Sequence, residues 1–186
     1  MSLRSILEFD ARLSSQLRVA ENPGFLRNLA AFFAHSGDSW FWAVALISLW
    51  FFSNSAWKQW EVVEFFGMLG LAGVVLVIKF LVRRERPEGE WGMIYRNTDP
   101  HSFPSGHAAR SFLIAVIASV LAPPWLAVVL WIWAPLVALA RTAMGVHYVS
   151  DVFAGAILGM IIGLIGLQVY QPMIDWLTAL IGFPLW

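Results

Sequence analysis

The chain has 186 residues, of which 59% are hydrophobic and 13% are charged, and its mean hydropathy is +0.69. A soluble domain is about 45–50% apolar and about 25% charged, so this composition indicates an integral membrane protein. The formal net charge is zero, which excludes the basic footprint of a nucleic-acid-binding protein, and the absence of cysteine excludes disulfides, thiol catalysis and cysteine-based zinc sites.

The N-terminal segment carries apolar residues at helical spacing with charges between them: Ile6, Phe9, Leu13 and Leu17. This pattern is typical of a helix lying in the membrane interface. Residues 1–20 lack the apolar core of about 7–15 residues that defines a secretory signal peptide. We therefore expect a single domain, residues 1–186, in which an interfacial segment, residues 1–37, precedes a transmembrane bundle, residues 38–174.

Five apolar segments predict transmembrane helices, because a bilayer is crossed by about 20 mostly apolar residues. They are Ser39–Trp57, Glu61–Val82, His107–Leu121, Pro124–Arg141 and Val152–Ile174. The third and fourth form a hairpin, since the adjacent prolines at 123 and 124 cannot lie inside one helix. The expected fold class is all-α, a polytopic transmembrane helix bundle of five spans. The apolar segment Phe25–His35 is too short to span alone, but a short extra span there would make six.

Three glycines, Gly155, Gly159 and Gly163, are spaced four residues apart in the last apolar segment. This spacing lets a neighbouring helix approach closely. We expect that neighbour to be another helix of the same bundle rather than a second copy of the chain.

Three polar clusters lie near the ends of the apolar segments. They are Lys79 with Arg86 and Pro87, then Pro104-Ser105-Gly106-His107, then Arg141 with His147 and Asp151. Five spans place residues 1–38, 83–106 and 141–150 on one face of the membrane, and the 53–60 loop, the proline pair and the C-terminus on the other. All three clusters are therefore expected to meet in one site.

Lys79, Arg86 and Arg141 are candidates for binding a phosphate group. A lysine acts as a compact point charge, and arginines offer planar forks that suit phosphate oxygens. Phosphoryl transfer depends mainly on positioning and electrostatic stabilisation, which three fixed cations can supply. Arg83 and Arg84 lie in the same stretch, and for these two we favour contact with lipid head groups.

Ser105, Gly106 and His107 are expected to begin the helix that runs to Leu121. The unpaired N–H groups of a helix N-terminus favour anions, Gly106 allows close backbone approach, and Ser105 adds a hydroxyl. His107 is a candidate general acid, because the helix dipole makes its proton easier to release. By itself, this tetrapeptide could equally be a serine N-cap followed by an incidental histidine.

His147 and Asp151 are predicted to be neighbours on one helical face, since they are four residues apart. A carboxylate bonded to one ring nitrogen leaves the other free as a nucleophile, so His147 would attack phosphorus and form a phosphohistidine. The pair could also be half of a metal site, but the surrounding cations would repel a divalent metal, and we expect neither metal nor cofactor. Asp38, Asp99 and His101 are expected to shape the loop or meet substrate.

The spacings Lys79-x6-Arg86-Pro87, Pro104-Ser105-Gly106-His107 and Arg141-x5-His147-x3-Asp151 resemble the three-part signature of the type 2 phosphatidic acid phosphatase (PAP2) superfamily. The third motif of that family usually opens with Ser-Arg, whereas Ala140 precedes Arg141 here. The resemblance implies the histidine roles given above and catalysis without a metal. It also implies a multi-pass protein of a prokaryotic plasma membrane, with its active site facing away from the cytoplasm.

The resemblance predicts a membrane phosphatase acting on a lipid phosphate or pyrophosphate. Undecaprenyl pyrophosphate, phosphatidic acid and phosphatidylglycerophosphate are the candidate substrates. A lipid phosphotransferase that uses the same phosphohistidine, and a non-catalytic lipid-binding membrane protein, are the alternatives. The outward orientation conflicts with the positive-inside rule, because five spans put most arginines, Arg96 among them, on the face of the clusters and only Lys58 on the other. A sixth span would move residues 1–24 across and ease this conflict.

Overall fold

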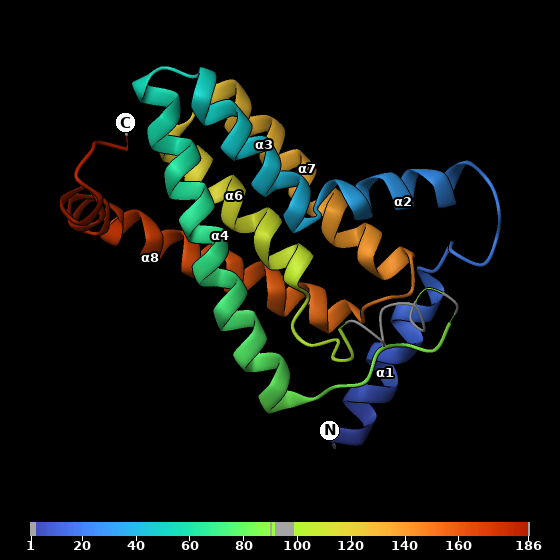
Figure 1. The fold of residues 1–186 in the computed structure, drawn as a ribbon. Helices are drawn as coiled ribbons and strands as arrows, with labels where there is room; N and C mark the ends of the chain where they lie inside the picture. The colour runs from blue at the N-terminus through green and yellow to red at the C-terminus, as the bar shows by residue number, and fades with distance from the viewer. Residues whose placement is uncertain (1–2, 90, 92–98, 186) are drawn as a thin grey trace.

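The structure is a computed structural model that describes residues 3–89, 91 and 99–185. Within these residues the fold is all-α, as predicted, with seven helices (Figure 1). They are α1 (Leu3–Gln16), α2 (Phe25–Ser36), α3 (Ser39–Phe52), α4 (Ser55–Val82), α6 (Gly106–Leu121), α7 (Pro124–Ala143) and α8 (Val149–Ile181).

Five of these helices correspond to the five predicted apolar segments. In the part of the chain that the structure describes, α4, α7 and α8 are long and apolar enough to cross a membrane, which agrees with an integral membrane protein. Helices α3 and α6 are apolar but have 14 and 16 residues, fewer than the usual span. A total of five spans therefore stays a prediction, and α2, with 12 residues, is shorter still.

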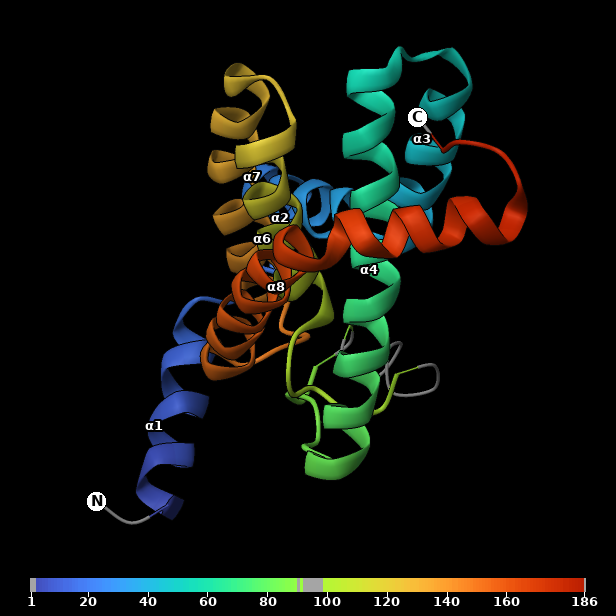
Figure 2. The same ribbon diagram turned by 90° about the vertical axis from the view of Figure 1, so that its left-hand side faces the viewer.

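The predicted boundaries of the first two segments are wrong. Helix α3 ends at Phe52, and α4 begins at Ser55 because the side chain of Asn54 caps it by accepting a hydrogen bond from Trp57 N (3.3 Å). Six residues assigned to the loop or to the first segment therefore belong to α4. Helix α8 is also longer than predicted at both ends, and it contains Pro172 and changes direction along its length (Figure 2).

Helix α6 is the centre of the bundle and lies against α4, α7 and α8 in both views (Figures 1 and 2). The side chains of Leu113, Ile114 and Ile117 are completely buried there. A Cβ added to Gly159 of α8 would lie 1.9 Å from the carbonyl oxygen of Ala109, and one added to Gly155 would lie 2.5 Å from that of Ser105. The glycine spacing thus serves packing inside the bundle, as expected, and it brings the start of α8 against the start of α6.

Helix α1 packs its polar face inward. Asp10 and Ser14 are buried against the start of α8, where Ser14 Oγ accepts a hydrogen bond from Val149 N (3.0 Å). Ile6 and Phe9, in contrast, are exposed. A helix that docks through polar groups and turns apolar groups outward suits a lipid interface, and this location of α1 stays a prediction.

The loops gather at two ends of the bundle as the topology predicted. Residues 83–89, 99–105 and 144–148 lie at one end, near α1. The turn between α3 and α4, the proline pair and the C-terminus lie at the other (Figures 1 and 2). All three polar clusters therefore occupy one end of the molecule.

Candidate active site

Backbone contacts hold the three clusters together. Glu85 and His101 form an isolated antiparallel bridge, and Ser102 N donates to the carbonyl of Arg84 (2.8 Å), so the segment after α4 lies beside the segment before α6. Ser105 N donates to the carbonyl of Asp151 (3.0 Å), which joins this loop to α8. Residues that are far apart in the chain thereby enclose one space.

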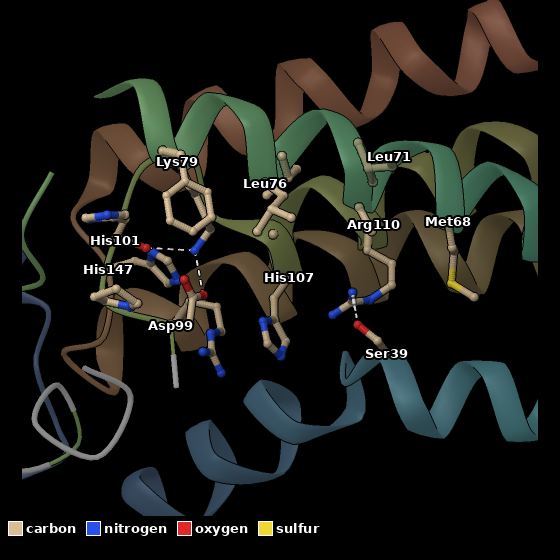
Figure 3. Close-up of a pocket in the computed structure, with 16 residues that line it drawn as sticks. Ser39, Met68, Leu71, Leu76, Lys79, Asp99, His101, His107, Arg110 and His147 are labelled. Atoms are coloured by element: carbon tan, nitrogen blue, oxygen red, sulfur yellow. Dashed lines mark hydrogen bonds and ion pairs between the residues drawn. The ribbon is translucent and has the colours of Figure 1, made fainter. Parts of the chain in front are cut away.

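That space is a cavity of about 320 Å³ with a polar and an apolar half (Figure 3). The polar half is lined by Lys79, Asp99, His107, Arg141 and His147. The apolar half is lined chiefly by one face of α4, with Met68, Leu71, Val75 and Leu76. An amphiphile with an anionic head and an apolar tail matches this division.

Lys79 and Arg86 share one carboxylate. Lys79 Nζ donates to Asp99 Oδ2 (2.6 Å) and to the carbonyl of His101 (2.7 Å). Arg86 Nη2 donates to the same Asp99 oxygen (2.7 Å), and both cationic side chains are buried. Asp99, whose side chain is 43% exposed, thus places an anion between two fixed cations.

The contacts of His147 define its tautomer. Arg86 Nη1 lies 3.3 Å from His147 Nε2, and a guanidinium can only donate, so Nε2 accepts and the ring proton resides on Nδ1. Nδ1 lies 3.6 Å from Asp151 Oδ2 and has no hydrogen-bond partner among the described residues. The ring therefore presents an unprotonated nitrogen to Arg86, while its Nδ1–H lies near the Asp151 carboxylate without a hydrogen bond to it.

The surroundings of His147 keep the ring neutral. The residue is 2% exposed and lies in the turn between α7 and α8. Burial, and then the charge of Arg86, hold the pKa of His147 well below its ordinary value, and Arg141 and Lys79 act in the same direction. A neutral imidazole is the form that can act as a nucleophile.

The predicted placement of His147 and Asp151 on one helical face is wrong in detail. Helix α8 begins at Val149, because Asp151 Oδ2 accepts a hydrogen bond from Tyr148 N (2.9 Å) and caps the helix there. His147 therefore precedes the helix, while Asp151 lies in its first turn. The two side chains still lie near each other, which the spacing alone predicted.

Arg84 holds Asp151, so its predicted contact with lipid head groups is wrong. Arg84 Nη1 donates to Asp151 Oδ1 (2.7 Å) and to Ser150 Oγ (2.6 Å), and Nη2 donates to Asp10 Oδ2 (2.7 Å). The physical reason is that α4 ends in a left-handed Arg83 (φ 51°), which turns the next residue back toward α8. Arg83 itself is exposed, and its contact with lipid head groups stays a prediction.

His107 is bonded to Asp38 at the start of α3. Its Nε2 lies 2.7 Å from Asp38 Oδ1, and the other oxygen of Asp38 lies 3.3 Å from His35 Nδ1. Burial raises the pKa of Asp38, but the hydrogen bonds and charges of His107 and His35 outweigh burial and lower it to about 2. Asp38 is therefore a stable carboxylate, and it opposes the effect of the nearby cations on a protonated His107.

The remaining predicted residues are also near the cavity. Arg141 of α7 and Gly106 of α6 line it. Ser105 is the N-cap of α6, with its side chain accepting from Ala108 N at 3.5 Å, and it is completely buried beside the cavity rather than lining it. Arg96 lies outside the described residues.

Two residues near the site were missed by sequence reasoning. Asp10 holds Arg84, which in turn donates to Asp151, and Arg110 lines the cavity. Asp10 is 141 residues from Asp151, and neither periodicity nor spacing links the two. Arg110 lies one helical turn after His107, and a cation inside a charge-poor apolar segment was the signal that could have found it.

Residues 61–174 match the family model described as PAP2 superfamily, and this range includes every cluster that lines the polar half of the cavity. The chain belongs to the PAP2 superfamily. A crystal structure of a transmembrane PAP2 type phosphatidylglycerolphosphate phosphatase from Bacillus subtilis has the same fold, with a TM-score of 0.71 at 22% identity over 90% of this chain and 87% of that one.

Two curated PAP2 relatives match parts of the chain. Lipid A 1-phosphatase of Porphyromonas gingivalis is 29% identical over 116 residues, 61% of this chain and 24% of that protein. Decaprenylphosphoryl-5-phosphoribose phosphatase of Mycobacterium tuberculosis is 39% identical over 93 residues, 50% of this chain and 51% of that protein. The matched part thus spans about a quarter of the first relative and about half of the second.

Proposed function

We propose that this PAP2 protein is a membrane phosphatase that hydrolyses a lipid phosphate or pyrophosphate through a phosphohistidine on His147. The observation that carries the proposal is the unprotonated Nε2 of His147 beside buried Lys79, Arg86 and Arg141, at the polar end of a cavity with an apolar half. Three cations can neutralise the charge that gathers on the phosphoryl oxygens during transfer.

The first step is the formation of the phosphohistidine. The substrate phosphate takes the place of the Asp99 carboxylate between Lys79 and Arg86, which brings phosphorus to the cations around His147. His147 Nε2 forms a bond to phosphorus while the bond to the leaving oxygen breaks, and His107 gives that oxygen its proton. Asp151 stabilises the positive charge that the imidazole of His147 gains.

The second step is hydrolysis of the phosphohistidine. Water attacks phosphorus, the bond from phosphorus to His147 Nε2 breaks, and inorganic phosphate is released. His107, now neutral, takes the proton that the water loses, which returns both histidines to their starting states. Neither step uses a metal or cofactor.

The apolar half of the cavity suits the tail of a lipid. Met68, Leu71 and Leu76 continue the cavity from the polar half toward the middle of α4, which is apolar enough to cross a membrane. The three candidate substrates have an anionic head group for the polar half of the cavity and an apolar tail for the apolar half. They are undecaprenyl pyrophosphate, phosphatidic acid and phosphatidylglycerophosphate. The similar proteins of Porphyromonas, Mycobacterium and Bacillus are likewise phosphatases by name, of lipid A, decaprenylphosphoryl-5-phosphoribose and phosphatidylglycerolphosphate.

The test is release of inorganic phosphate from these three lipids by purified protein in detergent, with EDTA present. We expect turnover of at least one lipid, unchanged by EDTA and inhibited by orthovanadate. Transfer of the phosphoryl group to an added lipid alcohol, with no release of inorganic phosphate when that alcohol is absent, would identify a phosphotransferase. Absence of turnover with all three lipids would contradict the proposal and favour the alternative, a non-catalytic lipid-binding protein.

The proposal also places the site at the extracytoplasmic face of a prokaryotic plasma membrane. The chain has no cysteine, so single cysteines can report the orientation. We expect an impermeant thiol reagent to label the Glu88→Cys variant in intact cells, because Glu88 is exposed and belongs to the segment 83–89 at the end that carries the site. Labelling of Ser55→Cys, at the opposite end, would show instead that the site faces the cytoplasm.

Arg84 and Arg83 offer a matched pair for testing how Asp151 is positioned. Arg84→Gln removes the charged bonds to Asp151 and Asp10, and we expect kcat to fall about 10–100-fold with KM little changed. Arg83→Gln removes an exposed cation whose Nε donates to the carbonyl of Phe80, and we expect less than about a twofold effect. Equal effects of the two substitutions in a steady-state assay would contradict a positioning role.

The depressed pKa of His147 predicts a loss of stability in acid. The folded protein resists protonation of this ring, whereas the unfolded chain accepts a proton near pH 6.5. Relative to a His147→Gln variant, the wild type should therefore lose stability as pH falls below about 6.5, toward the folded pKa. Thermal unfolding of both proteins in detergent measures this difference, and parallel curves at all pH values would contradict it.

A further inference from the structure

Arg110 is a buried cation that the proposed mechanism does not use. It is 9% exposed, it lines the cavity, and its guanidinium donates to the carbonyl of Gly37 through Nε (2.9 Å) and Nη2 (2.6 Å). Nη1 donates to Ser39 Oγ. Within residues 3–89, 91 and 99–185, no carboxylate lies within ion-pair distance of it, in contrast to Lys79, Arg84 and Arg86.

The charge of Asp38 acts on Arg110 from beyond ion-pair distance, but the oxygens of Asp38 already contact His107 and His35. A buried cation without a carboxylate in direct contact is stabilised when an anion joins it. A carbonyl and a hydroxyl orient the guanidinium of Arg110, but neither carries a full negative charge. Because the side chain lines the cavity, the opposite charge can come from a bound ligand.

The position of Arg110 indicates which part of a ligand it meets. Figure 3 shows His147 and Lys79 at one end of the cavity, His107 in the middle, and Arg110 between His107 and the apolar Met68. The transferred phosphoryl group lies by His147, and the leaving oxygen lies by His107, which gives it a proton. The rest of the leaving group then passes Arg110 before its tail reaches the apolar half.

We propose that Arg110 binds a second anionic group on the leaving-group side of the scissile bond. The preferred substrates are then lipids whose leaving group itself carries a phosphate, such as a polyprenyl diphosphate or a lipid with a phosphodiester next to its head group. Lipids with one phosphate, such as phosphatidic acid, leave Arg110 without an anion. This inference rests on the proposed phosphatase function and narrows its substrate class.

The test compares two substrates with the same tail, a polyprenyl diphosphate and the corresponding monophosphate. We expect wild-type kcat/KM to be at least about tenfold higher for the diphosphate. Arg110→Gln should lower kcat/KM about 10–100-fold for the diphosphate and less than about threefold for the monophosphate, while the inhibition constant of orthovanadate stays unchanged. Arg83→Gln, an exposed arginine outside the cavity, should change neither value.

Several results would overturn the inference. One is an equal loss for both substrates, which would show that Arg110 acts only by joining α6 to the Gly37–Ser39 corner. Another is no loss for either substrate. If Arg110→Gln fails to fold, wild-type binding decides: a polyprenyl methylenediphosphonate should bind at least about tenfold more tightly than the monophosphonate, and equal binding rejects the second anion site. Wild-type protein that hydrolyses neither of these two lipids, nor phosphatidic acid or phosphatidylglycerophosphate, would reject the proposed function itself.

Discussion

Replacing His147 with alanine is expected to lower phosphate release by about 10⁴-fold or more, because the proposed mechanism forms its covalent intermediate on this side chain. The remaining cations would still bind the head group, so the affinity for substrate should change much less. Steady-state release of inorganic phosphate from a lipid substrate measures this effect. A phosphohistidine is stable in alkali and labile in acid. A phosphoryl label with these properties should form on the wild type and be absent from the variant.

His101 provides a matched control for His147. Its ring also lines the cavity and packs against Phe80, whereas the contact that Lys79 uses is its backbone carbonyl. His101→Ala should therefore reduce turnover less than about tenfold. Turnover that persists in a folded His147→Ala protein, judged by its unfolding temperature, would refute the phosphohistidine mechanism.

Replacing His107 with glutamine should have an effect that depends on the leaving group. A general acid contributes about 10²–10⁴-fold when the leaving oxygen needs a proton, so hydrolysis of an alkyl phosphate should fall by that factor. An aryl phosphate such as p-nitrophenyl phosphate leaves readily as an anion, and its hydrolysis should fall much less. The ratio of kcat values for the two substrates measures the proton transfer.

Asp38 supplies a control for the same step. Asp38→Asn keeps a group of the same shape 2.7 Å from His107 Nε2 but removes the negative charge that opposes the cations. We expect a smaller loss than in His107→Gln, again concentrated in the alkyl phosphate. If His107→Gln slows the alkyl and aryl phosphates by the same factor, His107 is not the general acid.

The sequence was sufficient to predict the helices and the gathering of the three clusters. Hydropathy located each apolar segment, and the count of segments placed Lys79, His107 and His147 at one end of the bundle. The errors at Trp57 and at Val149 arose where side-chain caps, not hydropathy, decide where a helix begins. Roles of the individual site residues remain predictions for the experiments above.

The groups that hold the histidines could not be predicted because they depend on tertiary contacts over long sequence distances. Arg83 and Arg84 are identical in type and adjacent, yet only the backbone turn at Arg83 decides that Arg84 points to Asp151. Asp38 lies 69 residues before His107, and no local pattern pairs them. Such contacts follow from how α1, α3 and α8 pack, which a single sequence does not encode in its periodicity.

The docking of α1 through Asp10 has a practical consequence for anyone trimming this protein. The stretch that matches the superfamily begins at residue 61, yet two carboxylates from outside it contact the site: Asp10 accepts from Arg84, and Asp38 contacts His107. A fragment cut to the family boundaries would lack both carboxylates. A shortened chain made to test the proposed activity should therefore begin before Asp10.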